Sequence, residues 1–327
     1  MDVPQTDSEW ASVIESITST VEADLAGSND QPSISVSSLS DAQLANYIDH
    51  TLLKPDAATH QILEICDQAL KHHFRTVCVR EDRIERCRKH FRGTHVGRPA
   101  PPGLPAIAAV IGFPEGTYTT TTKCAEAHAA VQQGATELDM VLNYELLKAG
   151  NYTEVYHDVK AVRETIDKPI QLSFSADNAP LYGSREMPTG SYTQGAGSIT
   201  LKVILETSQL TSQQIIAGSL ISIRAGADFI KTSTGFRGGG ATVEDVQRMG
   251  AVAEVEARSS SRKRVKVKAS GGIRSLDDCL KMINAGAERI GASAGVTILK
   301  EFNIAETGGS STVSPVSAVS EVTTQTY

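Results

Sequence analysis

The chain has 327 residues, of which 40% are hydrophobic and 21% are charged, and its formal net charge is −7. This composition is typical of a soluble globular protein that is long enough for one α/β barrel or two smaller domains. An acidic chain without long Lys/Arg runs has no surface typical of nucleic-acid or anionic-membrane binding, and no apolar stretch reaches the roughly 18 residues that a membrane span requires.

Residues 1–38 form an acidic extension with a helical pattern. Thr6 and Glu9 have the spacing of a capping box, and Gly27 begins a polar stretch that would end the helix. Apolar residues follow helical spacing in between, at Trp10, Val13, Ile14, Ile17, Val21 and Leu25. The pattern leaves two alternatives open, a helix docked on the rest of the protein and a disordered acidic tail.

Between residues 39 and 306 the chain repeats one unit, a short β-branched run followed by a turn and a helical pattern. The predicted strands lie at 47–53, 76–79, 107–111, 137–142, 201–205, 228–235, 265–269 and 289–292. Eight such units in about 260 residues predict the α/β class and a closed (β/α)8 TIM barrel, which usually needs about 250 residues. A doubly wound dinucleotide fold would carry Gly-x-Gly-x-x-Gly after its first strand, and this chain does not.

Two further segments fall outside the repeat. Residues 168–199 carry several prolines and glycines, interrupt the path from the fourth helix to the fifth strand, and contain one extra predicted strand at 170–174. Because this insertion precedes a strand, we expect it at the N-terminal face of the barrel, away from the active site. Residues 307–327, rich in Ser, Thr and Val, predict a disordered tail.

The cysteine pattern and the charge of the N-terminal segment indicate the cellular compartment of the protein. Five cysteines without a Cys-x-x-Cys pair argue for reduced thiols and against a zinc ribbon. The first basic residue is Lys54, so neither a secretory signal nor a mitochondrial transit peptide is expected. We therefore expect a cytoplasmic protein.

Polar residues close several predicted strands, where the active site of such a barrel forms. They are Asp49, His50, Asp139, Glu206, Thr207, Lys231, Lys268 and, after the last strand, Gly291 and Ser293.

Lys231 and Lys268 end adjacent strands, and both can point into the barrel mouth. Two ammonium groups about 6 to 7 Å apart repel by about 2.5 kcal/mol at an effective dielectric constant of 20, and burial adds to the resulting fall in pKa. A lysine made neutral in this way can form a Schiff base with a carbonyl substrate. The alternative is a buried ion pair between one lysine and Asp139 or Glu206. Lys266 lies on the same face as Lys268, with Glu137 as its candidate partner.

Glycine-rich loops follow the seventh and eighth predicted strands. Gly271 and Gly272 lie in the first loop, and Gly291 opens the second. Glycines let backbone N–H groups approach an anion, and these two loops bind phosphate in many barrels of this type, so the pair predicts a phosphate site.

The sequence offers little for metal or thiol chemistry. The histidines include no His-x-His or His-Glu-x-x-His, and only His50 falls in a predicted strand, so we expect no metal site. Cys78, in the second strand, reads as a packed core thiol rather than a nucleophile.

Several motifs together resemble the deoxyribose-phosphate aldolase family over residues 44–303. They are Tyr47–Leu53, Thr76–Val79, Val110–Pro114, Glu137–Val141, Leu201–Thr207, Asp228–Gly235, Val267–Arg274 and Arg289–Ser293. The resemblance implies a class I aldolase, a carbon–carbon lyase without metal or cofactor. Such an enzyme reversibly cleaves 2-deoxy-D-ribose 5-phosphate to acetaldehyde and D-glyceraldehyde 3-phosphate.

The resemblance also implies roles for individual residues. Lys231 matches the Schiff-base lysine, Lys268 the lysine that perturbs its pKa, and Asp139 the acid that relays protons. The substrate pocket would include Asp49, Cys78, Thr207 and Thr234, and the phosphate site Gly271, Gly272, Gly291 and Ser293. The partner is then a small phosphosugar. The family often forms homodimers, but the tails, the Pro-rich linker and the insertion depart from its pattern and leave the subunit packing open.

Two other functions remain open from the sequence. One is another Schiff-base aldolase or a transaldolase acting on a phosphosugar. The other is a barrel that binds a phosphosugar without catalysis and acts as a scaffold through its tails.

Overall fold

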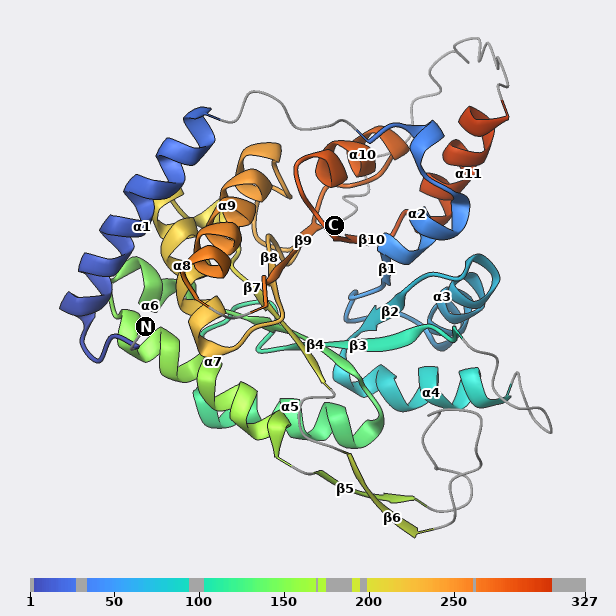
Figure 1. Ribbon diagram of the computed structural model, residues 1–327. Helices are drawn as coiled ribbons and strands as arrows, with labels where there is room; N and C mark the ends of the chain where they lie inside the picture. Colours follow the sequence, from blue (N-terminus) through green and yellow to red (C-terminus); the bar gives the residue numbers. More distant parts are fainter. Residues whose placement is uncertain are drawn as a thin grey trace.

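The computed structural model describes residues 3–27, 34–93, 103–168, 170–174, 190–194, 199–260 and 263–307. Eight parallel strands close into a barrel in the order β1-β10-β9-β8-β7-β4-β3-β2 (Figure 1). They are β1 (Ile48–Thr51), β2 (Thr76–Val79), β3 (Ala106–Ile111), β4 (Glu137–Val141), β7 (Thr200–Ile204), β8 (Phe229–Lys231), β9 (Lys266–Ser270) and β10 (Arg289–Ala292). The predicted (β/α)8 barrel is confirmed.

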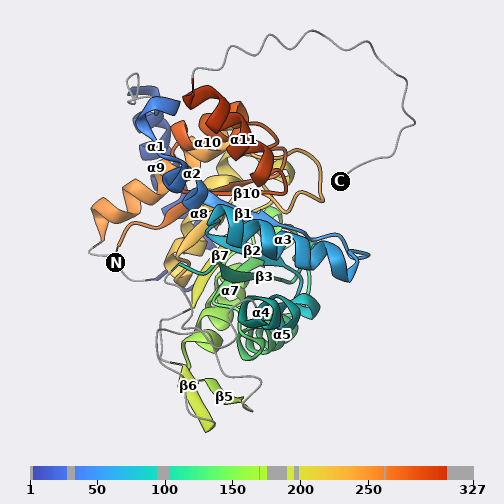
Figure 2. The same cartoon turned by 90° about the vertical axis from the view of Figure 1, so that its right-hand side faces the viewer.

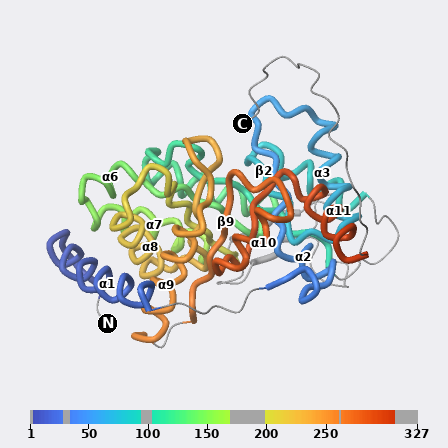
Figure 3. Tube along the Cα trace, turned by 90° about the horizontal axis from the view of Figure 1, so that it is seen from above, coloured from blue at the N-terminus to red at the C-terminus, as the bar shows by residue number. Residues whose placement is uncertain are grey.

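Helices alternate with the strands and surround the barrel (Figures 1 and 3). The longer ones are α3 (Thr59–His72), α4 (Ile84–Gly93), α5 (Thr120–Gln133), α7 (Tyr152–Asp167), α8 (Ser212–Ala225), α9 (Val243–Ser259), α10 (Leu276–Asn284) and α11 (Gly295–Glu306). Shorter helical segments are η1 (Val36–Ser38), α2 (Asp41–Tyr47), η2 (Glu81–Arg83), α6 (Tyr144–Lys148) and η3 (Thr207–Gln209). Gly134 and Gly226 end α5 and α8 at φ angles of 111° and 100°, a left-handed conformation that a side chain would strain.

Apolar side chains form two clusters. The larger one fills the layer between the strands and the surrounding helices. The smaller one lies among the residues that line the mouth of the barrel, and it consists of Leu53, Cys78, Ala108, Val110, Phe113, Val141 and Ile204, with Phe236 packed against it. This mouth cluster keeps the ends of the strands in a largely apolar environment.

The N-terminal extension contains helix α1 (Asp7–Gly27), which lies against α7, α8 and α9 (Figures 1 and 3). The backbone N–H of Glu9 donates to Oγ1 of Thr6 and that of Thr6 donates to Glu9, as the predicted capping box requires. Trp10 and three further apolar residues of α1 are buried. Helix α8 is buried along its whole length from Ile215 to Ala225, because α1 covers its outer side. Of the two alternatives, the structure contains the docked helix.

The insertion begins with the strand expected at 170–174, which is β5 (Ile170–Phe174). It pairs in antiparallel fashion with β6 (Gly190–Gln194), which the sequence did not predict. This two-stranded sheet projects away from the barrel between the end of α7 and the start of β7 (Figure 2). Residues 169, 175–189 and 195–198 of the insertion and residues 308–327 of the predicted tail lie outside the described residues. Within the described residues, no helix is both long and apolar enough to cross a membrane.

Candidate active site

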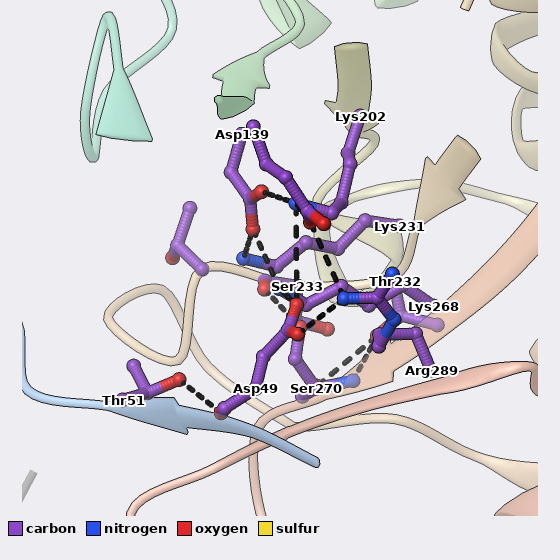
Figure 4. A network of polar contacts seen from close by, with 12 residues as sticks. Asp49, Thr51, Asp139, Lys202, Lys231, Thr232, Ser233, Lys268, Ser270 and Arg289 are labelled. Carbon is purple, nitrogen blue, oxygen red and sulfur yellow. Dashed lines mark hydrogen bonds and ion pairs between the residues drawn. The ribbon is translucent and has the colours of Figure 1, made fainter. Parts of the chain in front are cut away.

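Asp139, on the central part of β4, is the hub of a buried polar network inside the barrel (Figure 4). Its Oδ1 atom accepts a hydrogen bond from Nζ of Lys202 over 2.7 Å. Its Oδ2 atom accepts hydrogen bonds from Nζ of Lys231 and Nζ of Lys268, each over 2.7 Å. Strand register brings these donors together, because Lys202 is the neighbour of Asp139 across β4 and β7, and Lys231 is the neighbour of Lys268 across β8 and β9.

A second set of contacts lies beneath this hub. Arg289, at the start of β10, donates to Oδ1 of Asp49 over 2.6 Å and to Oε2 of Glu137 over 3.2 Å. Lys268 also donates to Asp49, and Nζ of Lys202 lies 2.6 Å from Oε2 of Glu137. All these side chains are at most 7% exposed, so the network is held out of water.

The charges of this network do not balance if every group is ionised. Its members are the carboxylates Asp49, Glu137 and Asp139 and the cations Lys202, Lys231, Lys268 and Arg289. Four cations against three carboxylates leave one positive charge in excess, which is costly in a buried site. Loss of one proton from one lysine removes the excess.

Of the three lysines, Lys231 loses the fewest ion pairs with carboxylates when it gives up its proton. Among the ion pairs of the described residues, Lys231 contacts Asp139 alone, whereas Lys202 and Lys268 each contact two or more carboxylates. A neutral amine can keep its hydrogen bond to Asp139. The excess charge is therefore most easily removed at Lys231.

The pKa shifts follow from the same contacts. Burial lowers the pKa of Lys231 below its usual 10.5, Asp139 opposes this fall, and the nearby Lys268 adds to it. Burial also acts to lower the pKa of Lys268, but the carboxylates of Asp139 and Asp49 outweigh it and raise that pKa. Burial acts to raise the pKa of Asp139, but Lys202, Lys231 and Lys268 hold it well below 3.8. The site therefore combines a lysine whose pKa is lowered, a lysine whose pKa is raised and a carboxylate whose pKa is lowered.

The mouth cluster forms an apolar wall beside Lys231. The rings of Phe113 and Phe236 meet edge to face with centroids 5.1 Å apart, and the guanidinium of Arg80 lies 5.2 Å from the Phe113 centroid. Cys78 is fully buried in this wall, and burial together with the charge of Asp139 raises the pKa of its thiol. A thiol in this state is not an activated nucleophile.

Thr207 and Thr234 lie on the two loops that follow β7 and β8, and both are buried. The hydroxyl and the backbone N–H of Thr234 both donate to the carboxylate of Glu206, whose pKa burial raises. Glu206 forms no ion pair with the cations of the network among the described residues, although the charge of Lys231 acts to lower its pKa against the effect of burial. Oγ1 of Thr207 and Oγ of Ser233 are buried without a hydrogen-bond partner among the described side chains. These two hydroxyls remain able to bond a ligand.

The two glycine-rich loops start side by side, because Gly291 is the register neighbour of Ser270. Gly271 and Gly272 have φ angles of 83° and 77°. The loop before α9 packs closely on them, since a Cβ atom on Gly240 would lie 2.0 Å from the carbonyl oxygen of Gly271. Ser293 is exposed just before α11. Backbone groups of both loops are thus placed at the rim of the barrel.

One expectation is wrong and two residues were missed. Lys266 does not pair with Glu137, because it is the first residue of β9, at the end away from the glycine-rich loop. Its side chain there is 43% exposed, and its Nζ atom lies 3.9 Å from Oε2 of Glu288. Phe229 lies between it and the network, 5.7 Å from Nζ of Lys266. Glu137 instead pairs with Lys202 and Arg289. The two missed residues are Lys202 and Arg289. Lys202 is, like Lys231, a lysine within an apolar strand, and this signal could have identified it. Arg289 is the first residue of the eighth predicted strand.

No group of three or more His, Cys, Asp or Glu side chains in the described ranges is arranged to hold a metal ion. His50 bonds Gln68 through Nε2 over 2.6 Å, and its ring lies tilted against the ring of Phe74, with centroids 4.9 Å apart. It therefore has a packing role at this position.

Comparison with known proteins agrees with this geometry. Residues 43–302 match the family model described as DeoC/LacD family aldolase. The chain belongs to the DeoC/LacD family of aldolases. It is thus an enzyme of the lyase class.

Curated relatives carry a more specific name. A protein from Coccidioides immitis (strain RS), named deoxyribose-phosphate aldolase, is 44% identical over 80% of this chain and 81% of its own length. One of the same name from Staphylococcus carnosus (strain TM300) is 41% identical over 78% of this chain and 95% of its own length.

Solved structures share the fold. A crystal structure from Coccidioides immitis, of a protein assigned as a deoxyribose-phosphate aldolase, superposes with a TM-score of 0.72 at 39% identity and covers 91% of this chain and 98% of its own. A deoxyribose phosphate aldolase from Aeropyrum pernix, described as a tetramer, superposes with a TM-score of 0.61 at 27% identity, over 81% of this chain and 92% of its own.

Proposed function

We propose that this aldolase reversibly cleaves 2-deoxy-D-ribose 5-phosphate to acetaldehyde and D-glyceraldehyde 3-phosphate through a Schiff base on Lys231. The observation that carries the proposal is the buried network with one positive charge in excess, in which Lys231 has the fewest carboxylate partners. The curated relatives named deoxyribose-phosphate aldolase support the choice of substrate.

The reaction begins at Lys231. Its neutral amine attacks C1 of the open-chain aldehyde, and Asp139, 2.7 Å from that amine, accepts the proton that the new ammonium releases. Return of a proton to the C1 hydroxyl lets water leave and forms an iminium. Lys268 remains charged beside the site throughout, so the pKa of Lys231 is low again once the free amine is released.

The iminium then draws electrons from the bond between C2 and C3, because acetaldehyde carries the first two carbons. Asp139 accepts the proton of the C3 hydroxyl, through a water molecule, and C3 becomes the aldehyde of D-glyceraldehyde 3-phosphate. The remaining enamine takes this proton back from Asp139 at C2, through the same water, and hydrolysis of the resulting iminium releases acetaldehyde and free Lys231. The low pKa of Asp139 suits a proton acceptor that starts each turnover ionised.

The rest of the pocket fixes the substrate. Backbone N–H groups of Gly271, Gly272 and Gly291, with the hydroxyl of Ser293, form the proposed phosphate site at the rim. Among the other pocket residues, Thr207 offers an unpartnered hydroxyl and Cys78 an apolar contact, while Thr234 is oriented by Glu206. Asp49 acts on the site by holding Lys268 and Arg289.

The first test combines turnover with trapping. Purified protein should release acetaldehyde from deoxyribose 5-phosphate in the presence of EDTA and without an added cofactor. Borohydride added during turnover should reduce the iminium to a stable adduct, and peptide mass spectrometry should place it on Lys231. An adduct that still forms in Lys231→Leu, or activity that EDTA abolishes and a metal ion restores, would contradict the proposal.

We also propose that the protein is cytoplasmic and works as an oligomer, with a homodimer as the simplest form. The tetramer described for the Aeropyrum pernix relative supports assembly of some kind. Sedimentation of the full chain tests this, and a monomer at micromolar concentration would contradict it.

A further inference from the structure

A second buried lysine lies outside the barrel and takes no part in the proposed reaction. Lys123, on α5, is fully buried, and its Nζ atom lies 2.6 Å from Oδ2 of Asp158, on α7. The other carboxylate oxygen of Asp158 accepts a hydrogen bond from the hydroxyl of Thr120, at the start of α5, over 2.7 Å. Buried Lys and Asp residues occur mainly as such pairs, so Asp158 accounts for the burial of the Lys123 charge.

The ammonium of Lys123 also reaches the end of a barrel strand. Its Nζ atom donates over 3.1 Å to the carbonyl oxygen of Val141, the last residue of β4. Asp139 lies two residues earlier on the same strand. A buried carbonyl at the end of a strand needs a donor, and here a side chain from the surrounding helix layer supplies one.

The same helix holds the end of the neighbouring strand. The backbone N–H of Gly112, directly after β3, donates to Oε2 of Glu126 on α5 over 2.7 Å. The stem of Lys123 passes against Gly112, where a Cβ atom would lie 2.9 Å from its Cε atom. Gly112 precedes Phe113, whose ring forms part of the apolar wall beside Lys231. Helix α5 thus fixes the ends of β3 and β4 through two of its side chains.

We propose that Lys123, held in place by Asp158, is a positioning residue that sets the location of Asp139 relative to Lys231. The inference rests on the proposed Schiff-base function, because Asp139 matters only if it exchanges protons with Lys231. A shift of about 1 Å at a catalytic group can cost about 100-fold in rate. Lys123 itself does not contact the substrate.

A single substitution is not enough to test this role. Lys123→Met keeps the length and the apolar stem of the side chain, but it leaves the charge of Asp158 buried without its partner and so weakens the fold. The double variant Lys123→Met/Asp158→Asn removes both charges, and the new amide can still accept from Thr120. The double variant therefore loses the hydrogen bond to the Val141 carbonyl without leaving an unpaired buried charge. An effect on the rate can then be told apart from an effect on stability.

The experiment measures the melting temperature, kcat and KM for deoxyribose 5-phosphate in both variants. We expect the double variant to regain most of the melting temperature lost in Lys123→Met, while kcat stays about 10- to 100-fold below the wild type. KM should change little, because the proposed phosphate loops follow β9 and β10. If kcat recovers together with the melting temperature, Lys123 is only structural and the inference is wrong.

A matched control is the buried bidentate pair of Arg224, on α8, and Glu256, on α9. Arg224→Met/Glu256→Gln should lower the melting temperature without lowering kcat, because this pair lies on the outer side of the helix layer, near Trp10 of α1. A fall in kcat equal to that of the Lys123 double variant would mean that any loss of a buried pair has this effect, and the inference would fail.

A further measurement follows the site itself. The rate at which borohydride traps acetaldehyde on Lys231 is recorded against pH in the wild type and in the Lys123 double variant. We expect the pH at half-maximal trapping to move in the variant, because Asp139 is displaced from Lys231. An unchanged pH profile would contradict the positioning role. A wild type that forms no adduct at Lys231 would instead refute the proposed function, so the two failures are distinguishable.

Discussion

Lys231 and Lys268 share one acceptor, the Oδ2 atom of Asp139, and each donates to it over 2.7 Å. They differ in their other contacts, because Lys268 also donates to Asp49 and Lys231 has no second carboxylate among the described residues. One carboxylate therefore supports two lysines that need opposite protonation states. The sequence argument relied on repulsion between the two lysines, whereas burial is the larger cause of the low pKa of Lys231.

Lys268→Met should move the activity of Lys231 to higher pH. The variant removes a nearby cation and leaves Asp139 to interact more strongly with Lys231, and both changes raise the pKa of Lys231. The neutral amine exists above that pKa, so the rate of borohydride trapping with acetaldehyde should rise at a more alkaline pH than in the wild type. A profile that stays in place, or that moves to lower pH, would contradict the assignment of Lys268.

Lys202→Met should lower the free energy of unfolding by about 3 to 5 kcal/mol, because it leaves Glu137 and Asp139 without one of their buried ion-pair partners. Guanidinium titration followed by circular dichroism measures the change. Lys202→Met/Glu137→Gln should recover part of the loss, since it removes one unpaired carboxylate. The control is Lys160→Met on the surface of α7, where the ion pair with Glu164 is worth about 0 to 1 kcal/mol. Equal losses in the two lysine variants would count against a buried network.

Trp10→Ala should destabilise the protein by about 3 to 5 kcal/mol, because the Trp10 side chain is fully buried between α1 and the barrel helices. Thermal and chemical unfolding of the full chain measure this loss. Ile304→Ala, at a position that is 51% exposed, is the control and should change stability by less than about 0.5 kcal/mol. If Trp10→Ala unfolds like the wild type, α1 does not contribute to the stability of the barrel.

Cys78 should react slowly with iodoacetamide in the folded protein at pH 7 to 8. Alkylation needs the thiolate, and burial together with Asp139 raises the pKa of this thiol, so little thiolate forms in that range. Cys78→Ala should still form the borohydride adduct on Lys231. Fast labelling of Cys78 in the native state, or loss of the adduct in Cys78→Ala, would show that the thiol takes part in the chemistry.

Local sequence patterns were sufficient for the barrel and for part of the site. Each strand and helix carries its own hydrophobic period, and the spacing of Thr6 and Glu9 predicted the start of α1 correctly. Lys231 stood out because a lysine inside a short apolar strand is unusual wherever it lies in the fold. Lys202 had the same signal but no loop motif after it, and it was missed.

The sequence by itself determined the eight-stranded barrel and placed Lys231, Lys268 and Asp139 on three of its strands. Only the tertiary structure showed which of the two lysines has the lowered pKa. Closure of the barrel sets β1 beside β10, so that Asp49 meets Arg289 and Lys268 across more than 200 positions of the chain. The protonation state of a buried lysine depends on the sum of all charges around it, and that sum exists only once the strands have closed.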